Sequence, residues 1–219
     1  MLGFTPNLDG IRPLRVLCLG AHSDDIEIGC GTTIFQLIEK VQPLDIRWIV
    51  FSGQCSRSEE AKSSAEFWLE SVHLKQIELH GFRDGFFPDQ RSTIKETFEK
   101  VKESYSPDII FTHYQEDLHQ DHRTINQLTW NTFRNHVIME YEIPKYDGDM
   151  GSPNLYVPVS EEIAEKKAVA LVKYFNSQGD KHWFDKNLFM GLMRIRGMES
   201  CSPSGYAEGF YSRKISLDL

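Results

Sequence analysis

Basic residues are too few in this chain for a general nucleic-acid binder. Lysine and arginine number 24 against 32 aspartates and glutamates, the formal net charge is −8, and no basic stripe is visible. Proteins that bind nucleic acid usually carry such a stripe to neutralise phosphates. The same shortage gives no support for adhesion to a membrane through a basic surface. We therefore expect neither nucleic acid nor a membrane as a partner.

Cysteines and long apolar runs are also scarce. The four cysteines form no short-spaced pair, no apolar stretch approaches membrane-spanning length, and the N-terminus lacks the basic start and apolar run of a secretory signal. These absences predict a reduced, cytoplasmic protein. The remaining composition, 40% apolar and 26% charged over 219 residues, is typical of a globular chain. We expect one domain over residues 1–219, with a core over about 14–145 and a C-terminal extension over about 146–219.

Strand-like and helix-like patterns alternate through the first two thirds of the chain. Short, mostly apolar runs predict strands at residues 14–20, 45–51, 76–80, 108–112 and 137–141. Apolar residues at helical spacing predict helices after the Gly29-Cys30-Gly31 turn, near Ser56, near Thr93 and over about 125–132. Such alternation implies a parallel sheet with right-handed crossovers. The predicted fold is α/β, a Rossmann-like three-layer sandwich with a mostly parallel sheet.

The C-terminal part is predicted to be less regular. A strand is expected over residues 154–159, a helix from Ser160 to about 175, and a second helix around 187–195, followed by a loop at 200–205. Further upstream, two pairs have the spacing of a helix capping box: Ser56 with Glu59, and Thr93 with Glu96.

Two short stretches hold most of the imidazole and carboxylate groups. They are Ala-His-Ser-Asp-Asp at 21–25 and Asp-Leu-His-Gln-Asp-His at 117–122, and each follows a predicted strand. In a doubly wound sheet of order 3-2-1-4-5 the first and fourth strands are neighbours, and ligands bind between their carboxyl ends. We therefore expect both stretches to bind one divalent metal. Each places two candidate ligands three residues apart, on one face of a helical turn: His22 with Asp25, and His119 with His122.

Three of these side chains match a catalytic zinc site, which has three protein ligands and a fourth position for water or substrate. The set is His22, Asp25 and His122. A metal there would lower the pKa of a water molecule and polarise a carbonyl oxygen, which suits hydrolysis of an amide or ester. Asp24 remains as a general base, and His119 can stabilise an oxyanion or protonate a leaving amine. Zinc is the expected ion, with Fe²⁺ or another divalent metal also compatible.

Other polar residues have more open roles. Either Asp121 or Asp117 could orient the histidines, and spacing does not divide the task between them. Arg57 follows the second predicted strand and could bind an anionic or hydroxyl-rich substrate, although an exposed charge at a helix start explains it equally well. His113 is ambiguous because it precedes the second stretch on a predicted strand. The other histidines are expected on the surface or in packing: His73, His80, His136 and His182.

The two stretches, with the Gly-Cys-Gly that follows the first, resemble the LmbE-like/PIG-L family of zinc-dependent N-deacetylases. Shorter matches extend over most of the chain: Arg57 and Glu60, residues 82–85, 106–108, 154–156, 177–178 and 206–208. The resemblance implies a Rossmann-like fold with zinc on His22, Asp25 and His122, Asp24 as base, His119 at the oxyanion and Arg57 near the substrate. Ser23, Gln120 and Thr32 depart from the family's usual proline, proline and glycine, but none of these departures removes a ligand.

The leading hypothesis is therefore a zinc-dependent hydrolase that deacetylates an N-acetylglucosamine-type amino sugar or its conjugate. One alternative is a non-catalytic sugar- or nucleotide-binding module in which the acidic stretches only cap helices. A second is a metal-dependent amidase acting on a non-sugar amide. A third is an iron oxygenase, because two histidines and one carboxylate also form a facial triad. The C-terminal part could also serve self-association into a homo-oligomer.

Overall fold

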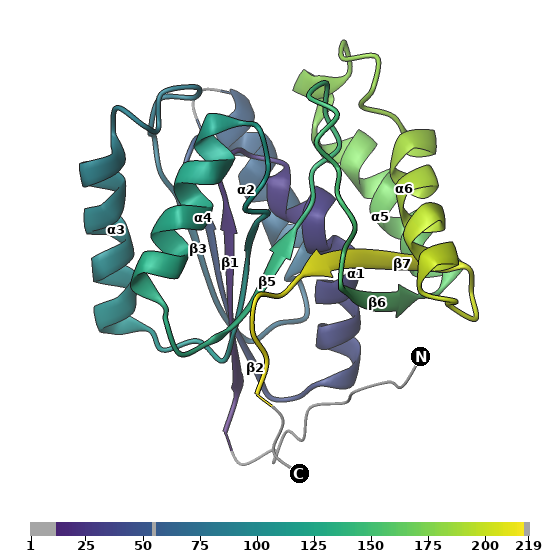
Figure 1. Cartoon of the computed structure of the whole chain (residues 1–219), viewed down its shortest axis with the longest axis horizontal. Coiled ribbons are helices and arrows are strands. Elements are labelled where there is room, and N and C mark those ends of the chain that lie inside the picture. The colour runs from purple at the N-terminus through teal and green to yellow at the C-terminus, as the bar shows by residue number, and fades with distance from the viewer. Residues whose placement is uncertain (1–11, 54–55, 217–219) are drawn as a thin grey trace.

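One mixed sheet organises the chain (Figure 1). The structure is a computed structural model that describes residues 12–53 and 56–216. Within these residues the sheet has seven strands in the order β3-β2-β1-β4-β5-β7-β6. The strands are β1 Leu14–Gly20, β2 Leu44–Val50, β3 Leu74–Leu79, β4 Ile109–His113, β5 Val137–Tyr141, β6 Leu155–Val159 and β7 Tyr206–Tyr211. The helices are α1 Asp25–Lys40, α2 Ser56–Trp68, α3 Arg91–Ser104, α4 Gln120–Thr132, α5 Glu161–Tyr174 and α6 Lys186–Glu199, with a 3₁₀ turn, η1, at Asn176–Gln178.

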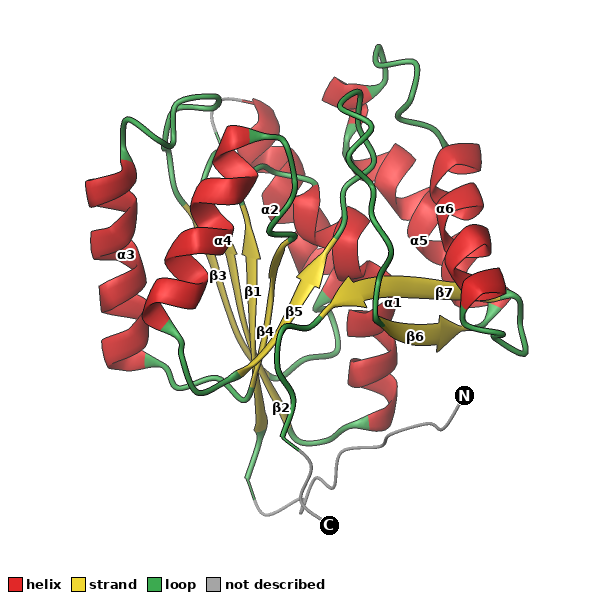
Figure 2. Cartoon of the chain, viewed as in Figure 1, coloured by secondary structure: helices red, strands yellow, loops and turns green. Residues whose placement is uncertain are grey.

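Helices cover both faces of the sheet (Figure 2). Successive side chains of a strand point to opposite faces, and in β1 both sets are buried. Val16 and Cys18 pack in the cluster that includes α1, α2 and α5, whereas Leu17 and Leu19 pack in the cluster with α3 and α4. This double burial explains why β1 is an almost continuous apolar run. The predicted three-layer α/β sandwich is confirmed.

The predicted order of the first five strands, 3-2-1-4-5, is also confirmed. Strands β1 to β5 pair in parallel, and their ends lie within two residues of the predicted ones. The structure adds that β7 pairs antiparallel with both β5 and β6. The C-terminal segments therefore extend the same sheet. No helix in the described ranges is both long and apolar enough to cross a membrane.

The structure corrects four local predictions. Strand β7 was missed, because a buried glutamate and a glycine at 208 and 209 interrupt the usual strand pattern. Helix α3 begins at Arg91 without a side-chain cap, so the predicted Thr93 cap is wrong. Helix α4 begins at Gln120 and includes part of the second polar stretch, because His119 caps it by accepting from the Asp121 N–H. The Ser160 cap is confirmed, whereas the side chain of Ser56 lies outside the described residues.

The fourth correction concerns the Gly29-Cys30-Gly31 segment, which was expected to be a turn before a helix. Helix α1 begins earlier, at Asp25, and continues through this segment with a kink at Cys30, where φ is −142° and ψ is 17°. Glycine at 29 permits close packing, since a Cβ there would lie 2.1 Å from the Tyr141 ring. A first segment of α1, residues 25–29, is thereby set apart from the rest of the helix.

Candidate metal and catalytic site

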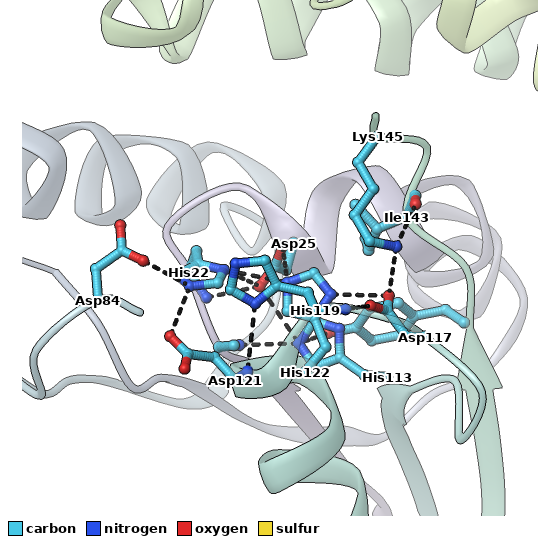
Figure 3. A network of polar contacts seen from close by, with 12 residues as sticks. His22, Asp25, Asp84, His113, Asp117, His119, Asp121, His122, Ile143 and Lys145 are labelled. Carbon is cyan, nitrogen blue, oxygen red and sulfur yellow. Dashed lines mark hydrogen bonds and ion pairs between the residues drawn. The ribbon is translucent and has the colours of Figure 1, made fainter. Parts of the chain in front are cut away.

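The two polar stretches meet at the carboxyl ends of β1 and β4. These strands are parallel neighbours, with Val16 opposite Ile109 and Cys18 opposite Phe111. His22 and Asp25 follow β1, and His122 lies in the first turn of α4 after β4 (Figure 3). The topology thus brings together side chains almost a hundred positions apart in sequence.

The three predicted ligands lie in mutual contact. His22 Nδ1 is 3.1 Å from His122 Nε2, and the Asp25 carboxylate oxygens lie 3.4 Å from His22 Nδ1 and 3.5 Å from His122 Nε2. Ligand atoms about 2.0–2.1 Å from a tetrahedral zinc are about 3.3 Å from one another. The donor types and their spacing therefore fit a zinc ion, and the assignment of these ligands stays a prediction.

Neighbouring side chains form overlapping groups that could also hold a metal. These groups are His22 with His119 and His122, Asp25 with His113 and His122, and His22 with Asp84 and Asp121. His113, left ambiguous by the sequence, is buried; its Nε2 accepts the Ala21 N–H at 3.0 Å and its ring stacks on His122 at 3.9 Å. An Nε2 atom that accepts this N–H is less free to bind a metal. The remaining four histidines belong to none of these groups.

Each orienting carboxylate serves a different histidine. Asp117 Oδ2 accepts from His122 Nδ1 at 2.8 Å, and Asp121 Oδ2 lies 3.3 Å from His22 Nε2. Asp121 is fully buried and also accepts the Gly85 and Phe87 N–H groups at 2.7 and 3.0 Å, which fixes the loop that follows β3. Each contact leaves the opposite ring nitrogen, His22 Nδ1 or His122 Nε2, facing the space between the three predicted ligands, here called the shared centre.

Charge distribution around the centre follows from these contacts. Burial raises the pKa of Asp117, but the His122 hydrogen bond and charge outweigh it and hold that pKa well below the usual range. Burial likewise opposes ionisation of Asp25, and the charges of His122, His113 and His22 outweigh it and lower the pKa of Asp25. Both groups are therefore carboxylates at neutral pH.

Asp24 differs from its neighbour. It caps α1 without a side-chain capping bond and is 8% exposed. Burial and the adjacent negative charge of Asp25 raise the pKa of Asp24 to about 6. A carboxylate with a pKa close to neutrality can accept a proton and later release it.

His119 lies beside the predicted ligand histidines, with its ring 4.9 Å from that of His22. Burial and the charge of His22 lower the pKa of His119, which favours the neutral ring at pH 7. Its Nδ1 accepts the Asp121 N–H at 3.3 Å, so the proton of the neutral ring resides on Nε2. The His119 ring can therefore donate one hydrogen bond.

Arg57 is tied to the site through Asp84, which lies in one of the short family matches but was assigned no role from the sequence. Arg57 Nη1 donates to Asp84 Oδ2 at 2.9 Å, and Asp84 Oδ1 lies 3.1 Å from His22 Nε2. Arg57 Nη2 also donates to Gln178 at 3.3 Å. The predicted substrate-binding arginine thus joins α2, the loop after β3 and η1.

Lys145 is a second residue that the sequence did not indicate. Its ammonium donates to Asp117 Oδ2 at 3.0 Å (Figure 3). The same ammonium also donates to Asp149. Asp149 in turn accepts the Leu118 N–H at 2.7 Å. Lys145 lies in the loop between β5 and β6, and no local motif marks its contact with the second stretch.

Comparisons with known proteins place this geometry in context. The family model for PIG-L, described as GlcNAc-PI de-N-acetylase, matches residues 17–133, which is more than half of the chain. The Escherichia coli (strain K12) protein named "Uncharacterized deacetylase YaiS" is 26% identical over 173 residues, which cover 73% of this chain and 89% of YaiS.

Solved structures share the fold at low identity. N,N'-diacetylchitobiose deacetylase from Pyrococcus horikoshii has a TM-score of 0.67 and 20% identity over 91% of this chain and 83% of that one. GalB, the 4-carboxy-2-hydroxymuconate hydratase of Pseudomonas putida, has a TM-score of 0.69 and 16% identity over 94% of this chain and 99% of that one. One fold thus hosts different reactions, and function must be argued from the site. By the match of its sequence to the family model, the chain belongs to the PIG-L family of deacetylases.

Proposed function

We propose that this protein is a zinc-dependent hydrolase that removes the acetyl group from an N-acetylated amino sugar, either free or within a conjugate. The observation that carries the proposal is the convergence of His22, Asp25 and His122 within 3.1–3.5 Å, beside a carboxylate whose pKa is raised to about 6. The sugar is inferred from relatives, whose names include a GlcNAc-PI de-N-acetylase and a diacetylchitobiose deacetylase.

His22, Asp25 and His122 would hold the ion. When bound, zinc supplies Lewis acidity, which lowers the pKa of a water molecule and polarises the acetyl carbonyl. The two ligand imidazoles contribute by staying fixed, because Asp117 and Asp121 each hold one histidine ring.

Asp24 accepts the proton that the water loses when its oxygen bonds to the acetyl carbon. Its pKa of about 6 leaves it mostly ionised at pH 7 yet basic enough to take that proton. His119 donates a hydrogen bond through Nε2 to the carbonyl oxygen as negative charge develops there. The C–N bond then breaks, the amine nitrogen takes from Asp24 the proton that the water gave up, and acetic acid and free amine leave and ionise in solution. Asp121, one of the two carboxylates predicted to orient the histidines, contributes through its contact with His22.

Arg57 is the proposed contact to substrate hydroxyl or anionic groups. Its guanidinium donates hydrogen bonds to Asp84 and Gln178 from two different segments, and its charge partly offsets the rise in the pKa of Asp24. A guanidinium that is joined to His22 through Asp84 is placed to contact the sugar that carries the scissile amide.

The test is an amine-release screen. Purified protein with zinc is incubated with N-acetylglucosamine, diacetylchitobiose and N-acetylglucosamine conjugates, with N-acetylated amino acids as the non-sugar comparison. We expect chelator-sensitive release from at least one sugar, restored by zinc, and absent in His122→Ala. Release from the amino acids alone would contradict the sugar assignment. No chelator-sensitive release from any compound would contradict the proposed hydrolase.

A further inference from the structure

We propose that the buried ion pair Lys167–Glu208, supplied by the C-terminal part of the chain, positions Asp24 and Asp25 by completing the kinked helix α1. This inference rests on the proposed function only for its effect on turnover. The pair joins α5 and β7, both of which pack against α1 (Figure 1). Both side chains are at least 96% buried, and their charged groups are 2.6 Å apart.

The kink gives α1 two extra helix ends. Residue 30 is non-helical, so the segment over 25–29 finishes there and a new helical segment begins after it. The first N–H groups and last carbonyls of a helical segment need partners from outside it. Inside a protein core, water cannot supply them at low cost.

Glu208 and Lys167 supply these partners, with the charges that each end favours. Glu208 accepts the Thr32 and Thr33 N–H groups at 2.9 and 2.8 Å, at the beginning of the second segment. Lys167 Nζ donates to the Ile28 carbonyl at 2.6 Å, near the end of the first segment. An anion at a helix N-terminus and a cation at a C-terminus complement the helix dipole. The ion pair therefore supplies hydrogen-bond partners that α1 lacks at the kink.

A short chain of contacts leads from the pair to the proposed base. The Ile28 N–H donates to the Asp24 carbonyl at 3.0 Å, so one residue links Lys167 to the backbone of Asp24. The first segment is a single turn, too short to hold its orientation alone. On its other side it abuts the Tyr141 ring, whose hydroxyl donates to the Leu19 carbonyl of β1 at 2.6 Å. The position of Asp25 relative to the histidines thus depends on both contacts.

A matched pair of variants separates this positioning role from general stability. Glu208→Gln removes one of the two acceptors that Thr32 and Thr33 need. Glu142→Gln is the control, because Glu142 forms a comparably buried pair with Arg196, at 2.7 Å and 6% exposure on each side, and among the described residues that pair makes no hydrogen bond to α1. The double variant Lys167→Met/Glu208→Gln leaves no unpaired charge and replaces the single variant if the latter does not fold.

Two measurements decide the proposal. In metal-free protein, amide hydrogen exchange at Ile28, Thr32 and Thr33 should become about tenfold faster in the Glu208 variant and stay unchanged in the Glu142 control. With the responsive sugar of the screen, kcat should fall about tenfold or more while KM changes little, because a misplaced base impairs chemistry more than binding. Unchanged exchange in α1, or equal effects in both variants, would overturn the proposal. If wild-type protein releases no amine, the proposed function fails, and hydrogen exchange alone still decides whether the pair holds α1.

Discussion

Replacing Asp117 by asparagine should weaken zinc binding while leaving the fold intact. Asp117 Oδ2 accepts from His122 Nδ1 at 2.8 Å and from Lys145 at 3.0 Å, and Oδ1 accepts the His119 N–H at 2.8 Å. Asparagine has one acceptor oxygen, and its NH₂ group would face at least one of these donors. His122 would lose either its fixed ring orientation or the negative charge that makes its Nε2 a better ligand.

The magnitude follows from the kind of contact that is lost. Removing a carboxylate that holds a metal-bound histidine typically costs 10–100-fold in metal affinity, about 1.4–2.7 kcal/mol. Because the pKa of Asp117 is held well below its usual range by His122, the wild-type group stays ionised near neutrality. The loss of zinc affinity in Asp117→Asn relative to the wild type should therefore be constant between about pH 6 and pH 8.

The assay is zinc competition against a chromophoric chelator, with urea unfolding of the metal-free protein as a check on the fold. Glu116→Gln is the control, because Glu116 is exposed and its Oε1 accepts only from the neighbouring Gln115 side chain among the described residues. Equal zinc affinity in Asp117→Asn and wild type would refute the reasoning, as would an equal loss in the control.

Three further predictions test other parts of the site. Asp24→Asn should keep the metal and lose about 10²–10⁴-fold in turnover, and normal turnover in this variant would exclude Asp24 as the base. In the wild type, kcat/KM should fall as pH drops below about 6, because the base becomes protonated there. Metal analysis and a pH–rate profile measure the two effects. Gly29→Ala places a Cβ 2.1 Å from the Tyr141 ring and should destabilise by about 1–3 kcal/mol or more in urea unfolding, whereas Gly191→Ala, in open space, should not. Burial raises the pKa of Glu27 to about 8, so the folded state favours the protonated acid and stability is lost as pH rises from about 4.5 to 8. In metal-free protein, the free energy of unfolding of Glu27→Gln should therefore equal that of the wild type at pH 4 and exceed it at pH 9. Parallel pH profiles of the two proteins would contradict this.

Local sequence patterns predicted most of the parallel core. Double burial of β1 produces an almost continuous apolar run. Helix α3 shows the spacing of one buried face, with Ile94, Phe98 and Val101 buried. The strand pattern failed at β7, where the buried Glu208 accepts backbone N–H groups of α1 and forms an ion pair with Lys167. A glutamate is predicted to lie on the surface when its partners, here from α1 and α5, are not known.

The gathering of the candidate ligands at one edge of the sheet was likewise predictable. The two pairs at three-residue spacing, His22 with Asp25 and His119 with His122, are local features, and the order of the parallel strands follows from the alternation of elements. The orientation of the polar side chains was not predictable, because it depends on loops packed from four separate segments. Asp117 contacts His122, Asp121 contacts His22, and Asp84 and Lys145 join them from two further loops.

The sequence by itself therefore determined the α/β class, the five parallel strands and the residue types gathered at the ends of β1 and β4. Periodicity and spacing are local properties, and they persist whatever the chain packs against. Only the tertiary structure decided which nitrogen of each histidine faces the shared centre, and where α1 is kinked. Those outcomes depend on hydrogen bonds between residues as far apart as Thr32 and Glu208, and long-range packing alone sets such contacts.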